Sequence, residues 1–251
     1  MKAKKIVTFI LTAIVFFTAA FLGVNTVYRI EEVSFVFDRI SEQANDEAAE
    51  IKSALEQAYL KRNTITAKDE EAKRIISEFS YFRLTAFEKD YPGRIVVSAT
   101  EDAETYAVSC GATYAIYSAD GGLLSVREEC VNRADGKDNL TVFDSDGRYD
   151  WSETFASSHV FCVLRTLDTR FEGVRANVEK AELSSPTALV SAEVLTIYFR
   201  EGVKGVIYNP ANMAEEKAEA LFKTYAENLA VADRALGTIY VSDRADARYE
   251  R

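Results

Sequence analysis

The sequence has 251 residues, 30 of them basic and 40 acidic, with a formal charge of −10, one histidine and three cysteines. A chain this acidic, without a stripe of Lys and Arg, repels phosphate, which argues against nucleic-acid binding. Its hydrophobic share of 48%, with 12% aromatic residues, excludes wholesale disorder and suffices for one large or two small folded domains.

The first 28 residues predict a membrane anchor. Three lysines stand in Met1–Lys5, and no charged side chain occurs in residues 6–28. As a helix, the apolar stretch Ile6–Val24 spans about 28 Å, close to the hydrocarbon thickness of a bilayer. The lysines predict a cytoplasmic tail at residues 1–5, one span at residues 6–28 and an extracytoplasmic body. A cleaved signal peptide is the alternative, but a clean Ala-x-Ala site is missing.

Residues 29–102 predict a small α+β module. The expected strands share an apolar alternation and are Arg29–Asp38, Phe82–Lys89 and Arg94–Thr100. The expected helices share an apolar stripe and are Asn45–Asn63 and a second one that opens at Thr66 with a capping-box pattern. The order is strand, helix, helix, strand, strand.

Residues 103–251 predict a strand-rich domain with two helices. The expected strands are Thr105–Ser109, Thr113–Ser118, Leu123–Arg127, Leu140–Phe143, Val174–Leu183, Leu189–Phe199, Lys204–Tyr208 and Gly237–Val241. The expected helices are Phe155–Phe171 and Met213–Ala232. Ser242–Arg251 is expected to be a polar tail.

Motifs for catalysis are few. His159 is the sole imidazole, and with Cys162 on the same helix face it offers too few ligands for zinc. Both lie in an apolar run, which favours a packed or partly exposed helix position over catalysis. No Gly-rich phosphate loop, HExxH or CxxC occurs. We therefore expect no catalytic residue, no cofactor, no metal and no small-molecule substrate.

Two further patterns leave alternatives open. The spacing of Cys110, Cys130 and Cys162 fits no metal site, so a Cys110–Cys130 disulfide and three reduced, buried thiols are the two interpretations. The run 144–147 with Asp150 and Glu153 resembles a fragment of a calcium loop. It lacks an early oxygen ligand and the bidentate Glu at position 12, which favours a hairpin turn with an acidic rim.

Several stretches, in order, match the motifs of one family. They are Arg29–Asp38 just past the span; Tyr91-Pro92-x-x-Ile95-x-Val97 with Glu101; Tyr114–Gly121; and Lys217, then Gly237–Val241 with Ser242-Asp243 and Ala247-Arg248-Tyr249. Together they resemble the FtsQ/DivIB bacterial cell division proteins. Two family elements depart: residues 101–106 lack the expected Arg and Pro, and no Leu-Pro-x-x-x-Gly stretch is recognisable near residues 138–147.

The resemblance implies a fold and a function. The fold is α+β: a single transmembrane helix, a POTRA-like domain at 29–102, and a β domain at 103–251 with an open sheet edge. The function is that of a non-enzymatic scaffold of the divisome in the cell membrane at the septum, bound to small bitopic partners like FtsB/DivIC and FtsL. An anchored enzyme or receptor of the cell envelope is the alternative.

The resemblance also implies where a partner binds. In such proteins the last strand and the following tail bind the partner, which adds a strand to the sheet; unpaired backbone groups on an edge strand suit this role. The corresponding residues are Tyr240, Val241, Ser242, Asp243, Arg244, Arg248 and Tyr249. The alternative is a frayed tail without contacts.

Overall fold

The computed structural model describes residues 2–147, 149–185 and 193–251. Its contacts divide the chain into two compact units, Met1–Asp102 and Ala103–Arg251. Both combine helices with a sheet, so the expected α+β class is confirmed. The N-terminal helix α1 (Lys2–Val27) contains an 18-residue window, Ile10–Val27, with a mean hydropathy of 2.1. This helix is long and apolar enough to cross a membrane.

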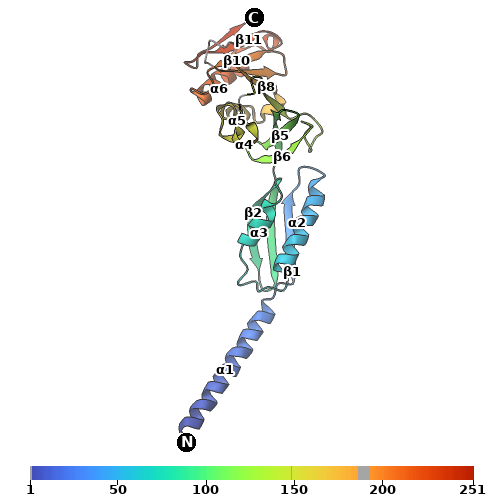
Figure 1. Ribbon diagram of the computed structural model, residues 1–251, viewed down its shortest axis with the longest axis vertical. Helices are drawn as coiled ribbons and strands as arrows, with labels where there is room; N and C mark the ends of the chain where they lie inside the picture. Colours follow the sequence, from blue (N-terminus) through green and yellow to red (C-terminus); the bar gives the residue numbers. More distant parts are fainter. Residues whose placement is uncertain (1, 148, 186–192) are drawn as a thin grey trace. The chain divides into compact units, whose positions relative to one another are not determined.

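The first unit contains a three-stranded sheet and two helices. After α1 come β1 (Glu32–Asp38), α2 (Ala44–Tyr59), α3 (Glu70–Ser77), β2 (Phe82–Asp90) and β3 (Arg94–Glu101). The sheet order is β1-β3-β2, with β1 parallel and β2 antiparallel to the central strand. The helices pack against this sheet (Figure 1). The element order agrees with the expected one, while the likeness to a POTRA domain stays a prediction.

The two helices of this unit are shorter than expected. The first ends at Tyr59 because Lys61 adopts a left-handed backbone with φ of 70°. The expected capping box at Thr66 is wrong: its hydroxyl donates to the Asn63 carbonyl, and α3 begins only at Glu70. Strong apolar alternation located the strands better than weak cap signals located the helix ends.

A buried carboxylate fixes the entry to α2. Glu101 is 2% exposed and accepts hydrogen bonds from the backbone N–H of Ile40 (2.6 Å) and of Ser41 (2.8 Å). The Ser41 hydroxyl also donates to it (2.5 Å). This glutamate, which belongs to the family-like segment, therefore joins the end of β3 to the loop after β1.

The second unit is built on one nine-stranded sheet. Its strands are β4 (Glu104–Cys110), β5 (Thr113–Ser118), β6 (Leu123–Arg127), β7 (Leu140–Asp144), β8 (Val178–Ser184), β9 (Val194–Phe199), β10 (Lys204–Tyr208), β11 (Thr238–Val241) and β12 (Ala247–Glu250). They lie in the order β12-β11-β10-β9-β8-β7-β4-β5-β6. Residues 189–192 of the strand expected at 189–199 lie outside the described residues.

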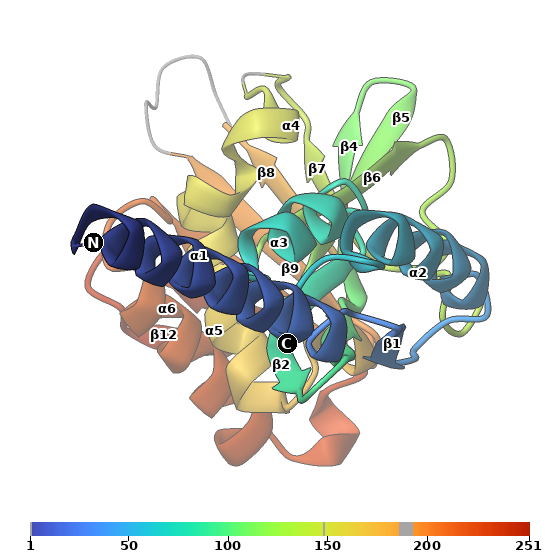
Figure 2. The same cartoon turned by 90° about the horizontal axis from the view of Figure 1, so that it is seen from below.

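Helices cover the apolar face of this sheet. They are α4 (Trp151–Thr154), a 3₁₀ turn (Phe155–Ser157), α5 (His159–Phe171), a second 3₁₀ turn (Val174–Ala176), α6 (Ala214–Phe222) continued by a π-helical stretch (Lys223–Asn228), and a last 3₁₀ turn (Val231–Asp233). Figure 2 shows α5 and α6 side by side, in agreement with their mutual contacts. Val160, Leu164 and Leu221 are fully buried against the sheet.

Two expectations for the helices of this unit are wrong. The helix expected at 155–171 is interrupted, because Ser158 is extended and caps a new helix by accepting from the Phe161 N–H (3.1 Å). The helix expected to reach Ala232 ends before Leu229, which is extended. Of the two interpretations left open for the cysteines, the structure agrees with free thiols, because all three are free, although half-buried rather than buried.

Candidate partner-binding edge

The end of the nine-stranded sheet is a hairpin that the sequence led us to misassign. Residues 247–250, expected in a polar tail, form β12 and pair antiparallel with β11. Within the described ranges, no strand pairs with the outer side of β12. The strand expected to be the edge, 237–241, is therefore an inner strand between β10 and β12, and the edge moves to Ala247–Glu250.

A tight turn sets the register of this hairpin. The Ala245 N–H donates to the Ser242 carbonyl (3.1 Å), and the Ser242 N–H donates to the Asp246 carbonyl (2.9 Å). Ala245 has φ of 59°, the left-handed residue of a three-residue hairpin loop. The Ser242 hydroxyl accepts from the N–H of Arg244 (3.2 Å) and of Asp246 (3.3 Å). The tail is thus folded back rather than frayed.

The register also tells which backbone groups face outward. Because Ser242 and Asp246 form a hydrogen-bonded pair, the alternation of an antiparallel ladder makes Tyr240–Arg248 and Thr238–Glu250 the next hydrogen-bonded pairs. Ala247 and Tyr249 then direct their N–H and C=O groups away from β11. These groups form the open edge to which another strand can be added.

Two of the seven expected contact residues face the core. Val241 is fully buried. The Tyr249 ring packs against the core, and its hydroxyl contacts the carbonyls of Asp233 (3.1 Å) and Leu236 (3.0 Å). Their side chains hold β12 in place and are not free for a partner. Had the sequence analysis recognised β12 as a strand, the alternation of its side chains would have shown that Tyr249 faces the core.

Two other expected residues lie on the open face of the sheet. Tyr240 pairs with Arg248 across the hairpin and stacks on Tyr208 with a centroid distance of 6.4 Å. Arg248 is 80% exposed and contacts Glu250 at 3.0 Å. Tyr208 was not among the expected residues, although it stacks on Tyr240 and is 39% exposed. An exposed guanidinium on β12 therefore borders the open edge, and an aromatic pair lies on the same face further in, on β10 and β11.

A buried lysine supports the turn. Lys217 of α6 has a fully buried side chain, and its Nζ donates to the carbonyls of Tyr208 and Asn209 (both 2.7 Å). Its Nζ also lies 3.6 Å from Oδ1 of Asp243, another expected contact residue. Burial lowers the pKa of Lys217, and the Asp243 carboxylate partly offsets that effect. The lysine thereby links α6, the end of β10 and the β11–β12 turn.

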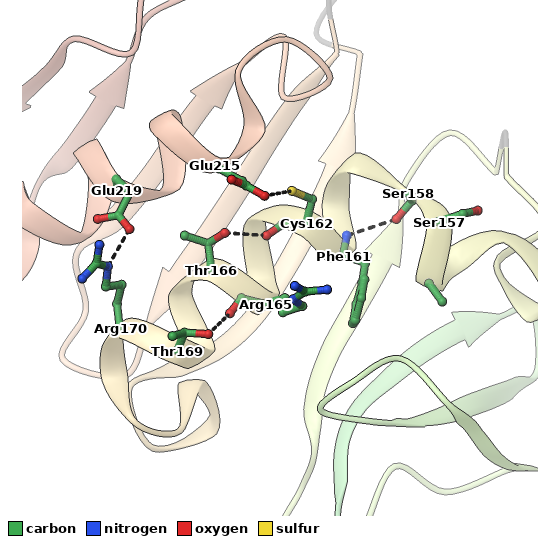
Figure 3. Close-up of a pocket in the computed structure, with 11 residues that line it drawn as sticks. Ser157, Ser158, Phe161, Cys162, Arg165, Thr166, Thr169, Arg170, Glu215 and Glu219 are labelled. Carbon is green, nitrogen blue, oxygen red and sulfur yellow. Dashed lines mark hydrogen bonds and ion pairs between the residues drawn. The ribbon is translucent and has the colours of Figure 1, made fainter.

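A groove between α5 and α6 is another surface feature of this unit. Its volume is about 540 Å³, and Figure 3 shows Cys162, Arg165 and Glu215 along it. The Cys162 sulfur lies 3.9 Å from Oε1 of Glu215, and Arg170 pairs with Glu219 at 2.5 Å. Burial and the Glu215 charge raise the pKa of the Cys162 thiol. That environment disfavours the thiolate which nucleophilic chemistry needs.

His159 lies at the first turn of α5, half-buried. Its Nε2 is 3.0 Å from Oε2 of Glu193, and the Tyr149 hydroxyl hydrogen-bonds the same carboxylate. Burial lowers the pKa of His159, and Glu193 acts in the opposite direction. The surround is neither closed and apolar nor part of the groove between α5 and α6, whose lining residues do not include it. The pattern matches a packed, partly exposed helix position.

The acidic run 144–147 forms a turn. Asp144 accepts from the N–H of Asp146 (3.1 Å) and of Tyr149 (2.9 Å), while Asp146 accepts from the Ser185 N–H (2.8 Å). In the part of the chain that the structure describes, no group of three or more His, Cys, Asp or Glu side chains could hold a metal ion. The carboxylates here cap backbone amides instead.

Comparison with known proteins adds no family. No protein-family model matches the sequence, and no curated protein matches it either.

Proposed function

We propose that this protein is a membrane-anchored, non-enzymatic scaffold of the bacterial division machinery, similar to FtsQ/DivIB. In this proposal α1 crosses the cell membrane once, with the N-terminus in the cytoplasm, and both folded units lie outside. The protein acts at the division septum through protein–protein contacts. Its partners are small bitopic division proteins like FtsB/DivIC and FtsL.

One observation carries this proposal: the open β12 edge, at the place where the family-like closing motif lies. An extended segment of a partner could continue the sheet by pairing with Ala247 and Tyr249. The exposed Arg248, on the open face of β12, would contact a side chain of the added strand. The order of apolar helix, strand-helix-helix-strand-strand unit and strand-rich unit agrees with the family's plan.

The test is depletion in the host combined with co-purification. We expect depleted cells to form filaments or to remain unseparated, a fluorescent fusion to gather at the septum, and the bitopic partners to co-purify with the full chain. Normal septation, with no division protein co-purifying, would refute the scaffold. An envelope enzyme or receptor would then be the better account, and a ligand in the groove between α5 and α6 would be sought first.

A further inference from the structure

The loops beside the end of α1 are fixed to it by short hydrogen bonds. The Thr64 N–H and hydroxyl donate to the Tyr28 carbonyl (2.7 and 2.9 Å), one residue past the end of the helix. Inside the helix, the Asn25 side chain accepts from the Asn63 amide (2.8 Å). The α2–α3 loop is therefore tied to the last turn of α1 and to the residue after it.

The β2–β3 turn is tied to the same place. The Thr64 hydroxyl also reaches the Pro92 carbonyl (2.6 Å), and the Glu31 N–H donates to the Gly93 carbonyl (2.8 Å). A Cβ atom at position 93 would lie 2.7 Å from the Arg29 carbonyl oxygen. Only glycine therefore lets the β2–β3 turn approach the backbone of Arg29 so closely. The Tyr28 and Tyr91 rings meet edge to face at 5.9 Å. Three segments thus converge where α1 ends.

Apolar groups and cations are exposed at this convergence. Ile65 is 47% exposed and Tyr91 is 54% exposed. The cations Arg29, Lys61 and Arg62 are exposed as well, and none makes an ion pair with another described residue. We call these five residues the anchor-side rim.

Several acids near the rim are paired with cations outside it. Glu32 and Asp90 lie within 4 Å of Arg94. Two acids, Glu70 and Glu71, line a pocket with Arg62, and Glu71 pairs with Arg74 at 3.1 Å. Lys89 adds a further cation, with its Nζ donating to the Ile65 carbonyl (3.0 Å). Exposed cations without an ion pair to any described residue, gathered at one end of the unit, contrast with the net charge of −10 of the whole chain.

The position of the rim relative to a bilayer follows from α1. An 18-residue window that ends at Val27 spans about 27 Å, nearly the whole hydrocarbon core, so the next few residues enter the headgroup layer. Segments hydrogen-bonded to Asn25, Tyr28 and Glu31 must lie at the same depth. Tyrosines favour this interface, and Lys and Arg are attracted there by anionic lipids.

We propose that the anchor-side rim is a docking surface for anionic phospholipid headgroups, on which the first unit rests. Ile65 and Tyr91 enter the interface, while Arg29, Lys61 and Arg62 meet the phosphates. The proposal rests on the proposed membrane anchoring by α1. It adds that the folded unit itself touches the membrane rather than standing clear of it on a flexible stalk.

The test places a depth-sensitive probe on the rim of the full chain. The native cysteines are replaced by serine, Ile65→Cys carries an environment-sensitive fluorophore, and the protein is reconstituted in nanodiscs that contain phosphatidylglycerol. Ile40→Cys is the matched control, because Ile40 has a similar exposure of 42% but lies beyond the opposite end of β1. We expect headgroup-level nitroxide lipids to quench the probe at position 65 severalfold more than the probe at position 40.

Charge variants test the role of the lipid phosphates. We expect Lys61→Gln with Arg62→Gln to weaken docking roughly tenfold or more, and quenching at position 65 to fall similarly when phosphatidylcholine replaces phosphatidylglycerol. Arg39→Gln, at the far end of β1, should change nothing. Equal quenching at positions 65 and 40 in phosphatidylglycerol discs would overturn the proposal. So would a fluorophore at position 65 that reports an apolar environment only after a partner protein has been added.

The same preparation separates this proposal from the one beneath it. If the chain fails to stay with the discs in alkaline carbonate, α1 does not anchor it and the membrane part of the proposed function fails. If the chain stays but position 65 is not quenched, anchoring stands and the docking surface is refuted.

Discussion

Lys217 Nζ lies 3.6 Å from Asp243 Oδ1, with the lysine fully buried and the aspartate in the turn that precedes the last strand. The same ammonium group donates to the carbonyls of Tyr208 and Asn209 at the end of β10. A helix side chain therefore positions the hairpin whose outer edge we assign to partner binding. The lysine was visible in the sequence as part of the family-like closing segment, but its burial was not.

Replacing this lysine should destabilise the second unit. We expect Lys217→Met to lower the free energy of unfolding by about 1–3 kcal/mol, because two carbonyls lose their buried donor. Urea unfolding measures the change. The control Asp243→Asn should cost less than about 1 kcal/mol, since Asp243 is 65% exposed. Equal losses for the two variants would contradict the assigned role of the backbone carbonyls.

The hairpin loop offers a stabilising substitution. Ala245 has a left-handed backbone, which costs an alanine roughly 1–2 kcal/mol and a glycine almost nothing. Ala245→Gly should therefore raise the free energy of unfolding by about 0.5–1 kcal/mol after the entropy of the unfolded glycine is subtracted. Thermal unfolding checks this. Arg244→Gly, one residue earlier and without a positive φ, should be neutral or destabilising; a gain there of the same size would refute the argument.

A buried ion pair holds the other end of the sheet. The side chain of Glu104 is 1% exposed. Its carboxylate accepts hydrogen bonds from the two terminal guanidinium nitrogens of Arg127 (3.0 and 2.6 Å) and from the side-chain amide of Asn139 (3.0 Å). We expect Arg127→Met to cost about 3 kcal/mol, because the buried carboxylate loses its bidentate guanidinium partner and keeps the Asn139 amide and the Arg133 N–H. In urea unfolding, Arg248→Met should change stability by less than about 1 kcal/mol, since its pair with Glu250 is exposed. A loss of less than about 1 kcal/mol in the free energy of unfolding for Arg127→Met would show that the buried Glu104 carboxylate does not need Arg127.

Acid should destabilise the protein partly through His159. Its folded-state pKa lies below the ordinary value near 6.5, so the unfolded chain binds the proton more readily. The stability that this histidine contributes is complete above about pH 6.5 and is lost as the pH falls through the lowered pKa. Unfolding at pH 7 and pH 5 should therefore show a larger loss for the unchanged protein than for His159→Gln. Equal losses would mean that the neighbouring Glu193 cancels the effect of burial.

Much of the fold could be predicted because its strands carry a strong alternation. In β3, Ile95, Val97 and Ala99 alternate with more exposed residues, and this two-residue period located the strand to within one residue. The buried Ile51 and Leu55 of α2 likewise lie on the predicted apolar stripe. A local sequence pattern suffices to locate a helix or strand when one face of the element is buried and the other is exposed to solvent.

The rest depends on contacts that the local pattern does not encode. The segment Ala247–Glu250 has just one large apolar side chain, Tyr249, so its sequence predicts a tail. It forms a strand because β11 has an unpaired edge and the turn at Ala245 returns the chain to that edge. The cysteines were ambiguous because spacing carries no distance. The contact residues stay a prediction, and their division into core-facing and open-face side chains could be read only from the register of β11 and β12.

The central claim is that a partner adds a strand to β12. Ala247→Pro removes an outward N–H while leaving the bonds to β11 intact, and proline is tolerated at such an edge position. Ala247→Ser keeps that N–H and is the matched control. Binding of the full chain to the host's FtsB/DivIC-like partner is measured for both variants, after urea unfolding has shown that both are folded. The account predicts that the proline variant loses binding at least tenfold while the serine variant retains it; undiminished binding by the folded proline variant would contradict the claim.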